Sequence, residues 1–224
     1  MPLLDKALSV IAPHNCLSCG QEGQIICSRC TVRKIPKIPS RCYRCQAATI
    51  EFAVCVRCRP SVSLDRVWVR ASYQGLAESL IREFKFGRAM AANSLIASEM
   101  KAVLPIIPKE MVIIPVPTAN TRRRQRGYDH AQLLAIQIAK TTSLLMIKPI
   151  IRLTSSRQVG ASRQERFGQL RKAFLITKTW QIAGRNILLV DDVVTTGATI
   201  EKVSSLLIQT GAKSVNAVIF AQRL

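Results

Sequence analysis

The sequence of 224 residues is short of long hydrophobic runs, acidic side chains and aromatic side chains. The best apolar run, residues 111–117, stops after seven residues, whereas a membrane-spanning helix needs about 20. We therefore expect no transmembrane segment. The short apolar stretch near the N-terminus carries Asp5 and does not have the pattern of a secretory signal peptide. These features predict a cytoplasmic protein, and a peripheral place at the inner face of the membrane is compatible with them.

Acidic residues number only 13 against 33 Lys and Arg, which gives a formal charge of +20. Such a charge concentrates polyanions at the surface, and nucleic acid is the commonest of these in a cell. An anionic membrane face and a phosphorylated metabolite are the alternatives, as is an ordinary solvated charged face. Aromatic residues make up 5% of the chain, which disfavours base stacking as the main mode of binding single-stranded DNA.

Cysteine is absent after residue 58, and the eight cysteines before it form four C-x-x-C pairs. Two such pairs supply the four thiolates of a tetrahedral zinc site, and joining neighbouring pairs closes the shortest loops. A disulfide framework would need an oxidising compartment, which the missing secretion signal argues against. Residues 1–62 are thus predicted to be a double zinc-ribbon domain with two structural zinc ions, whose ligands are Cys16, Cys19, Cys27, Cys30, Cys42, Cys45, Cys55 and Cys58.

Residues 63–224 have the pattern of an α/β domain, in which short apolar segments alternate with helical periodicity. A parallel sheet flanked by helices is the expected architecture, because each crossover between strands contains a helix. Strands are expected at 67–73, 111–117, 148–153, 186–192 and 214–221, with helices at 75–84, 95–104, 131–139 and 199–211.

One strand of this domain ends in two acids followed by a turn of Thr and Gly. Ligands collect at the carboxyl ends of parallel strands, where a helix N-terminus offers N–H groups to an anion. Two carboxylates would repel a phosphate, so their natural partners are hydroxyl groups or Mg²⁺. The pattern therefore predicts a sugar-phosphate site, made by Asp191, Asp192, Thr195, Thr196, Gly197, Ala198 and Thr199.

Residues 187–199 resemble the phosphoribosyl pyrophosphate (PRPP) signature of type I phosphoribosyltransferases. That resemblance implies that Asp191 and Asp192 bind the ribose hydroxyls and that residues 195–199 cradle the 5-phosphate. Residues 113–135 and 150–174 resemble the pyrophosphate loop and the mobile loop of ComF family proteins. These are competence proteins with a type I phosphoribosyltransferase domain and an N-terminal zinc ribbon. The resemblance implies further contacts to pyrophosphate from Lys85, Arg122, Arg123, Arg124, Arg126, Arg163 and Arg166.

Two functions of different class follow from this resemblance. The first is a role in DNA uptake and natural transformation, in which the chain binds a PRPP-type ligand with Mg²⁺, single-stranded DNA and components of the uptake machinery. Basic side chains around the cysteine pairs would then add a second DNA surface. The alternative is an active phosphoribosyltransferase, a pentosyltransferase that moves ribose 5-phosphate from PRPP to an acceptor. The cations for a pyrophosphate leaving group are present, but no motif identifies the acceptor.

Overall fold

The computed structural model describes residues 14–87, 89–119, 127–153 and 173–223. Within these ranges no helix combines the length and the apolar character needed to cross a bilayer. The helices are α2 (Ser28–Lys34), α3 (Gly75–Phe86), α4 (Ala89–Lys101), α6 (His130–Thr142) and α8 (Ala198–Gln209), with short 3-10 turns at Arg59–Ser61 and Thr179–Gln181. The strands are β1 (Val67–Ser72), β2 (Val112–Pro115), β3 (Leu145–Met146), β4 (Ile150–Arg152), β5 (Phe174–Ile176), β6 (Asn186–Val194) and β7 (Ser214–Gln222).

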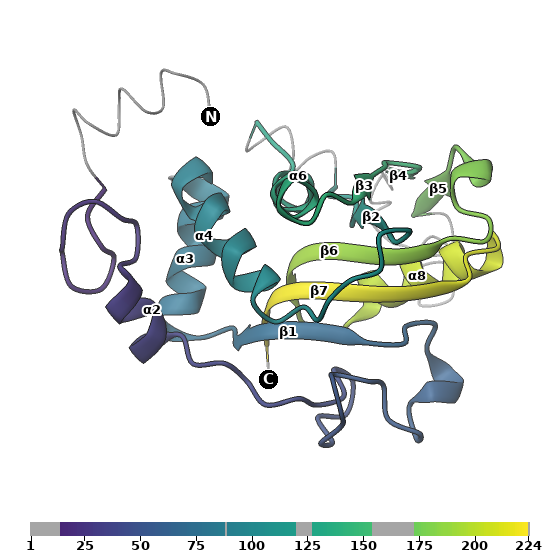
Figure 1. Ribbon diagram of the computed structural model, residues 1–224, viewed down its shortest axis with the longest axis horizontal. Coiled ribbons are helices and arrows are strands. Elements are labelled where there is room, and N and C mark those ends of the chain that lie inside the picture. Colours follow the sequence, from purple (N-terminus) through teal and green to yellow (C-terminus); the bar gives the residue numbers. More distant parts are fainter. Residues whose placement is uncertain (1–13, 88, 120–126, 154–172, 224) are drawn as a thin grey trace, which may run out of the picture.

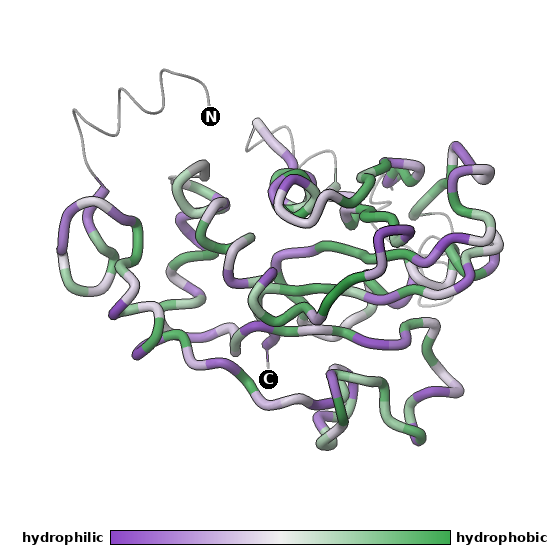
Figure 2. Tube along the Cα trace, in the orientation of Figure 1, coloured by the Kyte–Doolittle hydropathy of each residue, from purple (hydrophilic) through white to green (hydrophobic). Residues whose placement is uncertain are grey.

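Five strands form one parallel sheet in the order β1-β7-β6-β2-β3 (Figure 1). This confirms the predicted α/β fold with a parallel sheet. The longest strands, β6 and β7, are nine residues each and pair through the middle of the sheet. Hydrophobic residues are concentrated along these two strands (Figure 2). Because the strands are parallel, their carboxyl ends lie at one edge, where the acids of β6 meet the residues that follow β1, β2 and β7.

The two faces of the sheet are covered by different helices. One buried cluster joins α3, α4 and α6 to the side chains of Leu188 and Val190; in Figure 1 α6 lies above β6, and α3 and α4 lie at the left of the strands. The other cluster joins α8 to Ile187 and Leu189. Successive side chains of a strand point to opposite faces, so the alternation along β6 assigns each residue to one layer.

The two cysteine-rich segments belong to different buried clusters. The first ribbon, residues 14–30, contributes Cys16, Ile25 and Ile26 to the cluster that contains α3 and α4. The second ribbon, residues 42–58, contributes Tyr43 and Val54 to the cluster that contains α8. In Figure 1 the first ribbon lies beside α2 and α3, whereas the second lies below β1. Each ribbon therefore shares a hydrophobic core with the sheet domain.

The strand expected at 148–153 forms, but it lies outside the parallel sheet. It becomes β4, which pairs antiparallel with β5 in a separate two-stranded sheet. The sequence pattern could not show this, because the choice of partner strand depends on residues far apart in the chain.

The first strand, β1, is also more buried than its alternation predicts. Arg70 of β1 is only 4% exposed, and its Nε donates to Glu99 Oε2 of α4 at 2.7 Å.

Candidate functional site

The predicted acid pair lies at the carboxyl end of β6, the central strand of the sheet. Asp192 is buried and Asp191 is partly exposed. The backbone N–H of Asp192 donates to Asp191 Oδ1 at 2.9 Å. Because neighbouring side chains of a strand alternate, Asp192 is directed to the face covered by α3 and Asp191 to the face covered by α8. Both still reach the edge of the sheet, where the strand ends.

Lys85, predicted from the family resemblance, comes from the last turn of α3. Its Nζ lies 2.9 Å from Asp192 Oδ2, and the two side chains are 22% and 10% exposed. A lysine that neutralises one of two adjacent carboxylates lowers the cost of holding both at one strand end. The structure thus brings together Lys85 and the acid pair, which lie over 100 positions apart in the sequence.

A cavity of about 340 Å³ opens at this edge of the sheet. Asp191, Asp192, Thr195 and Thr199 line one part of it, so the predicted acids face an opening and are not enclosed in the core. The remaining lining comes from the ends of β1, β2 and β7 and from α3, α6 and β4, and consists of Tyr73, Lys85, Val116, Pro117, Thr118, Ala119, His130, Arg152, Val193 and Arg223.

The turn between β6 and α8 has the geometry expected of an anion-binding loop. Gly197 adopts φ +77°, a left-handed conformation that favours glycine, and is the N-cap of α8. The Thr196 hydroxyl accepts from the N–H of Ala198 at 3.4 Å. The N-terminus of a 12-residue helix therefore points its first N–H groups toward the cavity edge, beside Thr195 and Thr199.

The ionisation of Asp191 has a consequence for stability. Although Asp191 is partly exposed at the cavity, the protein atoms around its carboxyl group withdraw that group from bulk water, and this desolvation, followed by the charge of Asp192, raises the pKa of Asp191 well above its usual value. A raised pKa in the folded state means that the ionised carboxylate destabilises the fold at neutral pH, and that this penalty disappears as the pH falls through the raised pKa. We expect Asp191→Asn to raise the Tm of the ligand-free protein at pH 7, and the gain to shrink on acidification.

Thermal unfolding between pH 4 and 8, without Mg²⁺, measures this difference. The matched control is Asp65→Asn, because Asp65 Oδ1 lies 2.6 Å from Arg59 Nη2 and its neutralisation removes an ion pair. A Tm for Asp191→Asn equal to or below that of the unchanged protein at pH 7 would contradict the interpretation.

Sequence reasoning missed several residues that line the cavity. Tyr73 directly follows β1, Thr118 follows β2 and Arg223 follows β7. One signal could have found them, since residues just after parallel strands meet at the same edge. Asp129 caps α6 and accepts from Thr118 Oγ1 at 3.1 Å. The predicted pyrophosphate and loop residues Arg122, Arg123, Arg124, Arg126, Arg163 and Arg166 lie outside the described residues.

The eight cysteines form two groups of four, Cys16, Cys19, Cys27 and Cys30, and Cys42, Cys45, Cys55 and Cys58. The sulfur atoms of each group all lie within 4.8 Å of one another. Four thiolates around a tetrahedral zinc, with Zn–S bonds of about 2.3 Å, place their sulfurs about 3.8 Å apart, so both groups fit this metal. The predicted joining of neighbouring pairs is confirmed.

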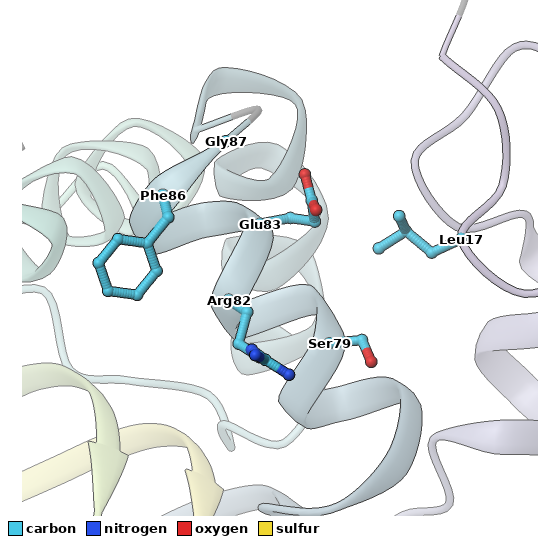
Figure 3. Close-up of a pocket in the computed structure, with 6 residues that line it drawn as sticks. All are labelled: Leu17, Ser79, Arg82, Glu83, Phe86 and Gly87. Carbon is cyan, nitrogen blue, oxygen red and sulfur yellow. The ribbon is translucent and has the colours of Figure 1, made fainter.

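A second opening, about 600 Å³ in volume, lies between α3 and Leu17 of the first ribbon (Figure 3). Ser79, Arg82, Glu83, Phe86 and Gly87 complete its lining. Five of the predicted site residues line the cavity at the end of β6, namely Lys85, Asp191, Asp192, Thr195 and Thr199, whereas Thr196, Gly197 and Ala198 line neither opening. We therefore assign the candidate site to the smaller cavity.

Comparison with known proteins gives a consistent result. A family model described as a phosphoribosyl transferase domain matches residues 124–224. The chain is 29% identical over 226 residues to competence protein ComFC of Bacillus subtilis, covering 96% of this chain and 91% of that one. It is 28% identical over 201 residues to competence protein F of Haemophilus influenzae, covering 85% and 87%. Among solved structures, a glutamine PRPP amidotransferase from B. subtilis aligns with 61% of this chain at 16% identity and a TM-score of 0.44, and the chain spans only 30% of that enzyme.

Proposed function

We propose that this chain, which is similar to competence proteins over most of its length and matches the phosphoribosyl transferase domain at residues 124–224, binds PRPP with Mg²⁺ and acts on single-stranded DNA during DNA uptake. The choice of PRPP as the ligand rests on the cavity at the end of β6, where two carboxylates, two threonines and a helix N-terminus lie close together. Carboxylates suit ribose hydroxyls and Mg²⁺, and the loop N–H groups suit a phosphate. A sugar phosphate offers both kinds of group in one molecule.

The proposed DNA role draws on the names of the relatives and on the charge of the chain. Both relatives are competence proteins. Exposed cations also lie on the ribbon segments, where Arg29, Arg33 and Lys34 belong to α2 and Arg57 to the second ribbon. Contacts of this kind bind the phosphate backbone without reading its sequence.

Calorimetry tests the ligand first. PRPP is titrated into the protein with and without Mg²⁺, and we expect saturable binding of one ligand per chain that is tighter with Mg²⁺. Ribose 5-phosphate and inorganic pyrophosphate, titrated separately, distinguish the two ends of the ligand. Absence of PRPP binding in the presence of Mg²⁺ would overturn this part of the proposal.

Single-stranded DNA is then titrated at several salt concentrations, and we predict an affinity that falls linearly on a log–log plot. Replacing Arg122, Arg123, Arg124 and Arg126 by Ala should lower the slope by roughly one unit for each phosphate that these side chains neutralise. The control replaces Lys109, Lys178, Arg185 and Lys213 by Ala, because it removes the same number of charges at exposed positions that the proposal does not assign to DNA. An affinity without salt dependence, or equal slopes for all three proteins, would contradict a phosphate-backbone contact at residues 122–126.

A transferase activity is the second candidate, and a neighbouring cavity favours it. This cavity, about 460 Å³ in volume, shares Pro117, Thr118 and Arg152 with the candidate site and also contacts Ile150 and Gln132. Its position beside the proposed ribose site leaves room for an acceptor. Release of pyrophosphate from PRPP and Mg²⁺ in the presence of a panel of bases and amines would support transfer. No release with any acceptor would favour ligand binding without transfer.

A further inference from the structure

The second ribbon touches the proposed phosphate loop through the side chain of Tyr43. Tyr43 lies between the zinc-ligand candidate Cys42 and Arg44, and it is only 4% exposed. Its ring packs on the loop so closely that a Cβ atom added at Gly197 would lie 3.0 Å from Tyr43 Cε2. Glycine is therefore required at position 197 for two reasons, its left-handed φ and the space taken by this ring.

Polar contacts fix Tyr43 in this position from two elements of the sheet domain. Its hydroxyl donates to Glu201 Oε1 in the first turn of α8. The neighbouring Arg44 Nη1 lies 3.0 Å from the same oxygen. Gln222 Nε2, at the end of β7, donates to the backbone carbonyl of Tyr43. The ribbon is thus joined both to the helix that follows the loop and to the strand beside it.

The two sides of the first turn of α8 have different neighbours. Side chains on a helix rotate by about 100° per residue, so Gly197 and Glu201 lie on the same side and Thr199 on the opposite one. Thr199 lines the candidate cavity, whereas Glu201 contacts the ribbon. The second ribbon therefore contacts the side of the helix start that carries Glu201, and the side that carries Thr199 and faces the cavity stays accessible to a ligand.

We propose that Tyr43 is a positioning residue for the anion-binding loop at residues 195–199, and that it acts only while the second four-cysteine site holds its metal. This inference rests on the proposed function, since it concerns the loop that would take the phosphate. Cys42 and Cys45 flank Tyr43 within the same knuckle. Zinc binding to such thiolates and folding of the surrounding turn are one process, so loss of the metal removes the support of the ring.

The first ribbon offers a matched control. Three of its cysteines, Cys16, Cys27 and Cys30, belong to the buried cluster that contains α3, whereas Tyr43 and α8 belong to the other cluster. Cys19→Ser and Cys45→Ser each remove one ligand from one site, and Cys19 is exposed while Cys45 is partly exposed. The two variants therefore remove the same kind of ligand, but only Cys45→Ser affects the four-cysteine group that contains the neighbours of Tyr43.

The experiment measures amide hydrogen exchange at residues 195–201 without ligand, and the PRPP affinity with Mg²⁺. Tyr43→Phe, which loses one hydrogen bond, should weaken PRPP binding about 3- to 10-fold, and Tyr43→Ala more. Cys45→Ser should reproduce Tyr43→Ala in both measurements. Cys19→Ser should stay within about twofold of the unchanged protein. Glu201→Gln keeps the shape of the acceptor and should weaken binding less than Tyr43→Phe.

Circular dichroism verifies that each variant is folded, and zinc content verifies that the Tyr43 variants keep both metals and that each Cys→Ser variant loses one. If Tyr43→Ala does not fold, the test compares the hydrogen exchange and the PRPP affinity of Tyr43→Phe with those of the unchanged protein. Equal effects of Cys19→Ser and Cys45→Ser, or unchanged exchange and affinity in the Tyr43 variants, would overturn the inference. If the unchanged protein does not bind PRPP, the proposed function fails, while hydrogen exchange of the loop still tests whether Tyr43 positions it.

Discussion

Replacing both Asp191 and Asp192 by Asn is expected to abolish PRPP binding at concentrations that saturate the unchanged protein. Hydrogen bonds that involve a charged group contribute about 1.5–3 kcal/mol each. If each carboxylate makes one such bond to a ribose hydroxyl or to Mg²⁺-bound water, the affinity falls by roughly 10²- to 10⁴-fold. Asn has nearly the size of Asp and still offers an acceptor oxygen to Lys85. In the unchanged protein the Nζ atom of Lys85 lies 2.9 Å from Asp192 Oδ2. The effect should therefore come from charge and not from repacking.

Calorimetry of the two single variants and the double variant measures this effect. Asp65→Asn is the control for each single variant, since it raises the net charge by the same amount at a residue that contacts Arg59 and not the cavity. The double variant should also bind DNA at least as tightly as the unchanged protein, because it carries less negative charge. PRPP affinity within threefold of the unchanged protein in the double variant would show that the ligand lies elsewhere.

Removing the zinc ions is expected to have the largest effect on stability. Structural zinc contributes an apparent free energy of about 10–16 kcal/mol in zinc-finger peptides. Here the loss should extend beyond the ribbons, because Ile25 and Ile26 of the first ribbon and Val54 of the second share buried clusters with the sheet. Treatment with a strong chelator should lower the Tm sharply and expose apolar surface to a hydrophobic dye.

Elemental analysis should first find two zinc ions per chain, one for each four-cysteine group. The control is the same chelator saturated with zinc. All eight cysteines should be open to alkylation after denaturation in chelator without a reductant, as thiols and not as disulfides. Complete removal of zinc without a change in Tm would contradict a structural role for the metal.

Much of the site could be predicted from local sequence, because its parts are close together in the chain. The acids and the loop of residues 191–199 occupy one strand end and the helix start that follows it. The spacing within each C-x-x-C pair indicated a metal, and the short loops between pairs indicated which pairs share it, as the structure confirms. In each case the ligand groups are held by a turn whose geometry depends on a few neighbouring residues.

The partners of those groups could not be predicted from local sequence. The pairing of Lys85 with Asp192 and the packing of Tyr43 on Gly197 join residues more than 100 positions apart. The antiparallel pairing of β4 with β5 is also a choice between strands that have similar patterns.

From sequence alone, this protein has an α/β domain, two four-cysteine groups and an acid pair before a glycine turn. Only the tertiary structure decided that the two ribbons join different buried clusters, and that Tyr43 of the second ribbon packs on the loop beside the acids. The reason is physical: local patterns specify strands, helices and turns, whereas the choice of which surfaces meet depends on how the complete set of apolar faces is buried together.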